Sequence, residues 1–272
     1  MPPDASSEMP FRLVDERRET PFLVICDHAS NHIPVRYQAL GLPATALERH
    51  IAYDIGAAAC AERLAEGLGC GAVLAGFSRL LIDPNRGEDD PTLVMKLSDR
   101  AIIPGNALVD PARDRAEWQL RLDTFYRPYH AAIGHALERI AARGEVPIIV
   151  SMHSFTPAWH GRARPWQIGL LWDKDDRLAA PLFERFGAEP DLAVGDNMPY
   201  SGSLKGDCLY RHGTSNGYPH ILIELRQDLV HEENGQHHWA DFLRDVLTEI
   251  CARPEVAESL AERRYFGSHA DG

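Results

Sequence analysis

Four short apolar runs in this chain end in, or contain, polar residues that can do chemistry. Asp27 and His28 follow Phe22–Cys26, Asn85 and Arg86 follow Phe77–Ile82, His153 follows Ile148–Met152, and Glu224 lies within Ile221–Leu225. Short aliphatic runs predict buried strands, and polar residues at the strand ends of an α/β sheet converge on one edge. The sequence therefore predicts a site at that edge.

Two of these residues, His28 and His153, suit a metal centre. Catalytic zinc takes imidazole nitrogen and carboxylate oxygen from three protein ligands and keeps one position open. We expect Asp54 to be the third ligand, because an amide oxygen such as that of Asn31 is a poorer ligand for zinc. His50 lies four residues before Asp54 and would share its face on a helix. A ligand role for His50, a support role behind the metal site and a solvated surface pair all remain open.

An acid inside an apolar strand is costly unless it has a defined partner or task. Glu224 stands in such a run. Beside a metal ion it would act as general base and then as the acid that protonates a leaving amine. A salt bridge with Arg226 or another arginine is the alternative.

The segment Asp83-Pro-Asn85-Arg86 offers a guanidinium fork beside an amide. That combination suits a substrate carboxylate. Arg79 is expected to polarise the scissile carbonyl, with a purely structural role as the alternative. Tyr200, in a long irregular segment, is expected to close over the substrate, although a loop tyrosine also serves simple packing.

The composition excludes several classes of protein. The chain has 272 residues, 44% of them hydrophobic, and a formal charge of −12 without a basic stripe, which argues against a nucleic-acid partner. Its five cysteines form no CxxC pair, which favours a reducing compartment. No apolar stretch is long enough to span a membrane. We therefore expect a cytoplasmic protein whose partner is a small molecule; the sequence leaves its oligomeric state open.

Strands and helices alternate along the chain, which predicts a mostly parallel or mixed sheet with helices on both faces. We expect one domain over residues 1–272, with a core at about 20–250 and peripheral or frayed ends at 1–19 and 258–272. The expected strands are Phe22–Cys26, Ala72–Ile82 (one or two strands), Pro147–Met152, Gln167–Trp172 and His220–Leu225. The expected helices are Thr45–Leu68, Arg115–Arg143 with a kink or split at Pro128, Arg177–Phe186 and Gln236–Cys251.

Six motifs, in this order, resemble those of the N-formylglutamate amidohydrolase family. They are Asp27-His-Ala-Ser-Asn31, His50-Ile-Ala-Tyr-Asp-Ile-Gly56, Ser78-Arg-Leu-Leu-Ile-Asp-Pro-Asn-Arg86, Ser151-Met-His-Ser-Phe155, Asn197-Met-Pro-Tyr-Ser-Gly202 and Ile223-Glu-Leu-Arg-Gln-Asp228. The resemblance covers about residues 20–250 and implies a phosphorylase/hydrolase-like fold similar to that of zinc carboxypeptidases and aspartoacylases. In those proteins a histidine–acid pair, an Asn-Arg clamp, a second histidine and a catalytic glutamate follow one another.

The resemblance implies a role for each matching residue. His28 and His153 would be zinc ligands, Asn85 and Arg86 the carboxylate clamp and Glu224 the base. The His-x-x-Glu pair of the carboxypeptidases is replaced here by His28-x-x-Asn31, which leaves Asp54 as the expected acidic ligand and Asn31 as a residue expected to contact substrate.

The expected activity is zinc-dependent hydrolysis of the amide bond of a small N-acyl amino acid such as N-formylglutamate. One Zn²⁺ per chain is expected, another divalent metal being possible. Two alternatives remain: a zinc amidase or carboxypeptidase acting on peptides or cell-wall fragments, and a non-catalytic binding protein on the same scaffold.

Overall fold

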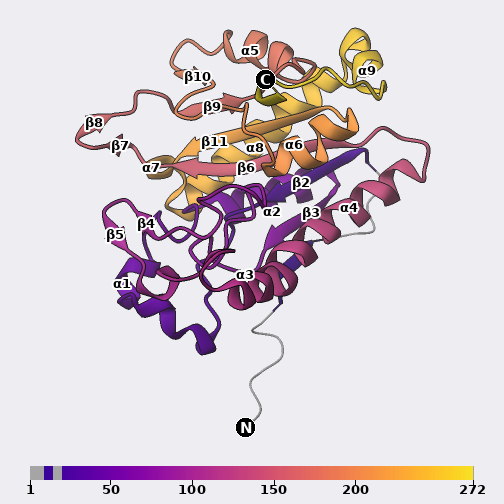
Figure 1. The fold of residues 1–272 in the computed structure, drawn as a ribbon. Helices are drawn as coiled ribbons and strands as arrows, with labels where there is room; N and C mark the ends of the chain where they lie inside the picture. The colour runs from indigo at the N-terminus through magenta and orange to yellow at the C-terminus, as the bar shows by residue number, and fades with distance from the viewer. Residues whose placement is uncertain (1–8, 15–19, 272) are drawn as a thin grey trace.

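Seven strands form one mixed sheet through the middle of the protein, in a computed structural model that describes residues 9–14 and 20–271 (Figure 1). Their spatial order is β1 (Phe11–Val14), β3 (Gly71–Ala75), β2 (Phe22–Cys26), β6 (Ile148–Phe155), β11 (His220–Arg226), β9 (Ile168–Leu171) and β10 (Val194–Asp196). Strands β3, β2, β6 and β11 are parallel, whereas β1 and β9 run antiparallel to their inner neighbours. The expected single-domain α/β fold with a mixed sheet is confirmed.

Helices cover both faces of this sheet (Figure 1). The α-helices are α1 (Ala44–Leu47), α2 (Ala57–Leu68), α3 (Arg115–Arg121), α4 (Arg127–Ala141), α5 (Ala179–Phe186), α6 (Cys208–His212), α7 (Gln227–Val230), α8 (Glu233–Cys251) and α9 (Pro254–Leu260). The shorter helical turns are η2 (Val35–Gly41), η3 (Pro104–Asn106), η4 (Leu122–Tyr126), η5 (Thr214–Asn216) and η6 (His269–Asp271). Alternate residues of β2 point to opposite faces, so Val24 packs into the core under α2, α5 and α8 and Ile25 into the core under α3 and α4.

The carboxyl ends of four strands meet at one edge of the sheet because β3, β2, β6 and β11 are parallel. His153 of β6 lies in register with Glu224 of β11, so two of the polar residues found in the sequence are neighbours. Two small hairpins, β4 (Leu97–Ser98) with β5 (Ala101–Ile102) and β7 (Ala158–Trp159) with β8 (Arg162–Ala163), lie together at the left of Figure 1.

The single helix predicted over Thr45–Leu68 is wrong. The chain forms α1, then turns, and enters α2 only after Gly56, whose φ of +80° and position against the backbone of Val230 exclude a side chain. Asp54 lies in the intervening turns, where its backbone N–H donates to the carbonyl of His28. A loop therefore delivers Asp54 to the sheet edge.

The strand prediction for Ala72–Ile82 holds only for its first part. Strand β3 ends at Ala75, and Phe77–Ile82 leaves the sheet as turns although its apolar side chains are buried. A buried apolar run in a loop has the same composition as a buried strand, and that similarity explains the error. Asn85 and Arg86 therefore follow a buried loop.

The interruption predicted at Pro128 is confirmed. The π turn η4 separates α3 from α4 and places Pro128 in the first turn of α4, where its missing N–H needs no acceptor.

The two ends of the chain contribute to the fold. Phe11–Val14, in a segment expected to be peripheral, forms β1 and pairs with β3. Near the other end, Ser268 is buried and donates to Asp173, and Tyr210 donates to Asp271. The part of residues 258–272 that the structure describes is thus held against the rest of the domain. Over all the described residues, no helix is long and apolar enough to cross a membrane.

Candidate active site

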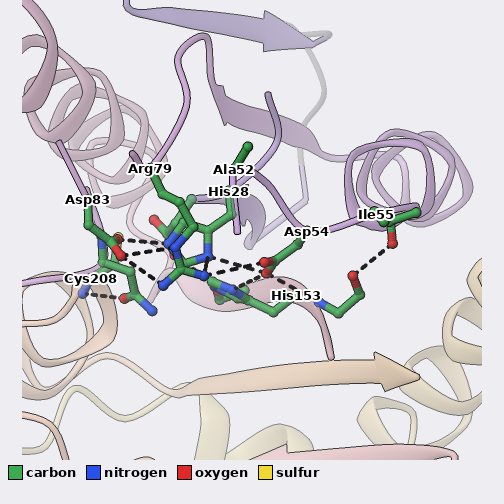
Figure 2. A network of polar contacts seen from close by, with 12 residues as sticks. His28, Ala52, Asp54, Ile55, Arg79, Asp83, His153 and Cys208 are labelled. Atoms are coloured by element: carbon green, nitrogen blue, oxygen red, sulfur yellow. Dashed lines mark hydrogen bonds and ion pairs between the residues drawn. The ribbon is translucent and has the colours of Figure 1, made fainter. Parts of the chain in front are cut away.

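His28, Asp54 and His153 converge at the carboxyl edge of the sheet. Asp54 Oδ2 lies 2.9 Å from His153 Nδ1 and 3.3 Å from His28 Nδ1, and all three side chains are buried. Figure 2 shows the three side chains turned toward one another. Each offers one ligand atom, and these atoms all lie within 4.8 Å of one another. Two imidazole nitrogens and a carboxylate oxygen are a donor set that suits zinc or a similar divalent metal.

The Nε2 atom of each imidazole, the outer nitrogen that does not face Asp54, is held by a second carboxylate. His28 Nε2 lies 2.8 Å from Asp83 Oδ1, and His153 Nε2 lies 3.0 Å from Asp27 Oδ2. Asp27 and Asp83 are fully buried. An acid on the outer nitrogen fixes the orientation of a histidine ligand and raises its basicity. Neither acid was predicted from the sequence to have a role, although Asp27 precedes His28 and Asp83 lies two residues before Asn85.

Distant residues keep Asp27 in place. Tyr129 of α4 donates to its Oδ1 at 2.9 Å, and Ser151 of β6 donates to its Oδ2 at 3.3 Å. Asp83 is held by Arg79 and by the backbone N–H of Asn85. Each buried carboxylate therefore has donors that offset its loss of hydration.

The charges within this cluster reinforce one another. Burial alone would lower the pKa of His153, but the hydrogen bonds that its ring nitrogens donate to Asp27 and Asp54 raise it well above its ordinary value. Burial would likewise raise the pKa of Asp54, yet the nearby charge of His28 and a hydrogen bond from His153 lower it. In the metal-free protein the cluster thus favours imidazolium facing carboxylate. A metal ion would have to displace those protons.

Arg79 is part of this cluster. Its Nε and Nη2 donate to Asp83 Oδ2 at 3.2 and 2.8 Å, and its Nη1 lies 3.5 Å from Asp54 Oδ1. Its Nη1 also lies 3.1 Å from His28 Nδ1. These contacts favour the structural alternative for Arg79 over polarisation of a carbonyl.

Glu224 is a buried acid with an unpartnered oxygen. Among the described residues, nothing forms a hydrogen bond to its Oε2, and burial raises its pKa to about 7. Its expected alternative partner, Arg226, instead pairs with Asp228. A carboxyl with a pKa near neutrality both accepts and donates protons at neutral pH.

One cavity of about 400 Å³ is lined by His28, Asp54, Arg79, His153 and Glu224. Its wall also includes Asn85, Arg86, Tyr200, His50 and Asp207. Asp207 was not among the residues predicted from the sequence. His50 Nε2 lies 3.4 Å from Asp99 Oδ2, in the turn between β4 and β5. Asn31 is not among the lining residues, and its amide donates to the carbonyl of Leu47 at 2.9 Å. That hydrogen bond gives the amide of Asn31 a structural role in holding a loop, and its contact with substrate stays a prediction.

A second buried group, His130, Cys208 and His212, also brings three possible ligand atoms together. His130 Nδ1 and His212 Nε2 are already hydrogen-bonded at 2.9 Å, and the group does not line the cavity. The His28, Asp54 and His153 group is the one that opens onto space for a substrate.

Comparison with known proteins identifies a family whose sequence model matches the chain, and several solved structures that are similar to it. The sequence model of the N-formylglutamate amidohydrolase family matches residues 20–231. The crystal structure of a gene product from Agrobacterium tumefaciens is similar with a TM-score of 0.86 and 33% identity, over 93% of this chain and 98% of that one. The crystal structure of N-formylglutamate amidohydrolase from Ralstonia eutropha JMP134 has a TM-score of 0.55 and 24% identity, over 92% and 98%. No curated protein sequence matches the chain.

The raised pKa of Glu224 predicts how stability depends on pH. The ordinary pKa of 4.5 rises to about 7 in the folded protein, so the folded state holds this proton more tightly. The penalty for burying Glu224 is absent below pH 4.5, grows up to pH 7 and stays constant above it. Glu224→Gln should therefore raise the free energy of unfolding of chelator-treated protein by about 3 kcal/mol at about pH 8, and by much less at about pH 5.

Urea unfolding at the two pH values measures this difference. The exposed Glu258→Gln serves as the matched control and should change little at either pH. An equal gain for Glu224→Gln at both values would show that Glu224 is not the group whose burial costs stability.

Proposed function

The chain belongs to the N-formylglutamate amidohydrolase family and is a hydrolase of amide bonds, and we propose that its substrate is a small N-acyl amino acid such as N-formylglutamate. The observation that carries this proposal is the joint position of His28, Asp54, His153 and Glu224 in one cavity with Asn85 and Arg86. A metal-ligand group, a proton-transfer acid and a carboxylate clamp are the parts that this hydrolysis needs.

We propose that His28, Asp54 and His153 hold one Zn²⁺. Their donor set and the two acids behind the imidazoles support this assignment. When bound there, zinc would supply a Lewis acid that polarises the acyl oxygen and makes water more acidic.

Glu224 performs the proton transfers in this proposal. It accepts a proton from the attacking water and then delivers a proton to the leaving nitrogen, so that an amine departs. Its burial beside His153 and its unpartnered oxygen suit both steps.

Arg86 and Asn85 position the substrate through its carboxylate. Both line the cavity, and Tyr126 donates to the backbone carbonyl of Arg86, which holds this segment in place. Tyr200 lies at the rim, half exposed, with its ring 5.2 Å from the guanidinium carbon of Arg164. From there Tyr200 can cover a bound substrate.

The five cysteines are free in the structure, and this supports the cytoplasmic location proposed for the enzyme.

Metal analysis tests the proposed ligands. The purified protein should contain about one zinc equivalent, and His28→Ala and His153→Ala should each lose it because a three-ligand site cannot spare one ligand. Glu224→Gln should keep the zinc and lose turnover, since the substitution removes only proton transfer. Elemental analysis and activity assays of the three variants measure both effects. Stoichiometric zinc in His153→Ala would exclude this residue as a ligand.

Kinetics on paired substrates test the carboxylate clamp. Arg86→Ala should lower kcat/KM for an N-formyl amino acid at least about tenfold, because a charge-assisted hydrogen bond contributes about 1.5–3 kcal/mol. For the C-terminal amide of the same substrate, Arg86→Ala should lower kcat/KM much less. Arg86→Lys should restore little, since a point charge cannot reproduce the guanidinium fork. An equal loss on acid and amide would mean that Arg86 does not read the carboxylate.

A further inference from the structure

Arg86 and Asp207 carry opposite charges on two loops that touch. The side-chain oxygen of Asn85 accepts a hydrogen bond of 3.1 Å from the backbone N–H of Cys208. This bond joins the residue before Arg86 to the residue after Asp207. Both charged side chains line the cavity of the active site. A cation and an anion therefore stand close together in its wall.

These two charges are not paired with each other. The ion pair of Arg86 is with Asp90, at the long distance of 3.9 Å. Asp207 Oδ1 accepts the backbone N–H of Tyr210 at 2.6 Å and so caps α6. No residue in the described part of the chain forms a hydrogen bond to Asp207 Oδ2. A guanidinium and a carboxylate oxygen thus remain available to a ligand.

The available oxygen of Asp207 is in a costly position. The residue is 5% exposed, and burial, together with the charge of Asp27, raises its pKa to about 7. Its Oδ2 has no donor within the described ranges, so a ligand N–H placed there would gain a strong hydrogen bond.

We propose that Asp207 is a specificity-determining residue that accepts a hydrogen bond from the nitrogen of the scissile amide while Arg86 holds the neighbouring carboxylate. The inference rests on the proposed function. In an N-acyl α-amino acid the amide nitrogen and the carboxylate are attached to the same carbon, so a donor and an anion are presented side by side. The acceptor oxygen of Asp207 and the guanidinium of Arg86, which lie near each other in the cavity wall, match this donor and anion.

The same contact serves the product. Hydrolysis breaks the acyl carbon–nitrogen bond; the acyl carbon takes the water oxygen and leaves as a carboxylate, and the nitrogen gains both hydrogens of water and leaves as an ammonium group. Asp207 then faces a cation instead of an amide N–H. The pair Arg86 and Asp207 accordingly selects α-amino acids over acids that lack the nitrogen.

Asp207→Asn is the test variant, because asparagine keeps the cap of α6 and changes only the carboxyl group. Asp90→Asn is the matched control, since it removes the same charge next to Arg86 from a residue outside the cavity lining. The zinc-loaded enzymes are assayed on an N-formyl amino acid and on the O-formyl ester of the corresponding hydroxy acid, which has no N–H.

Asp207→Asn should lower kcat/KM on the amide at least about tenfold and change that on the ester less than about threefold. Asp90→Asn should leave the amide-to-ester ratio of wild type unchanged. The proposal would be overturned if Asp207→Asn lowered kcat/KM equally on both substrates, or if it left kcat/KM on the amide unchanged.

A binding measurement separates this inference from the proposed function. In the background of Glu224→Gln, calorimetry compares the free amino acid with the acid that lacks its amino group. With Asp207 in place, the amino acid should bind at least about tenfold more tightly than the acid without the amino group. The additional substitution Asp207→Asn should abolish that preference. Absence of N-formyl hydrolysis with this preference intact would contradict the proposed reaction alone. Equal binding of the two ligands would contradict the role of Asp207 whatever the reaction.

Discussion

Each histidine of the candidate metal site is fixed by carboxylates at both ring nitrogens, and the rest of the site depends on this constraint. His28 lies between Asp54 and Asp83, and His153 between Asp54 and Asp27. Because the cluster is buried, each of these interactions is stronger than it would be in water, and each missing partner would be costlier. The imidazoles are thereby aimed at a common point before any metal arrives.

The fold supplies this constraint through the parallel strands. Asp27 and His28 follow β2, and His153 lies near the end of β6 beside Glu224 of β11, so the sheet fixes their spacing. Loops bring the remaining parts to the same edge, Asp54 before α2 and the segment from Arg79 to Arg86 after β3. Rigid strands thus set Glu224 against the proposed ligands, while loops carry Asn85 and Arg86, which are proposed to meet substrate.

The sequence predicted the parts of the candidate site that follow apolar runs, because such runs mark buried segments, although Phe77–Ile82 is a loop and not a strand. His28, His153 and Glu224 were found in this way. Asp54 was chosen for its ligand chemistry although the helix expected around it does not exist. Asp27 and Asp207 were missed, since their roles depend on contacts that no local pattern shows: Tyr129, which holds Asp27, lies 102 residues away along the chain. Spacing alone also does not reveal that the amide of Asn31 holds a loop by donating to the carbonyl of Leu47.

The central claim is that His28, Asp54 and His153 bind the metal, and anomalous diffraction at the zinc edge from crystals grown with zinc tests it most directly. The account predicts one strong peak about 2.0–2.2 Å from Nδ1 of each histidine and from a carboxylate oxygen of Asp54. A peak at the other buried group, His130, Cys208 and His212, with none between the three proposed ligands, would contradict it.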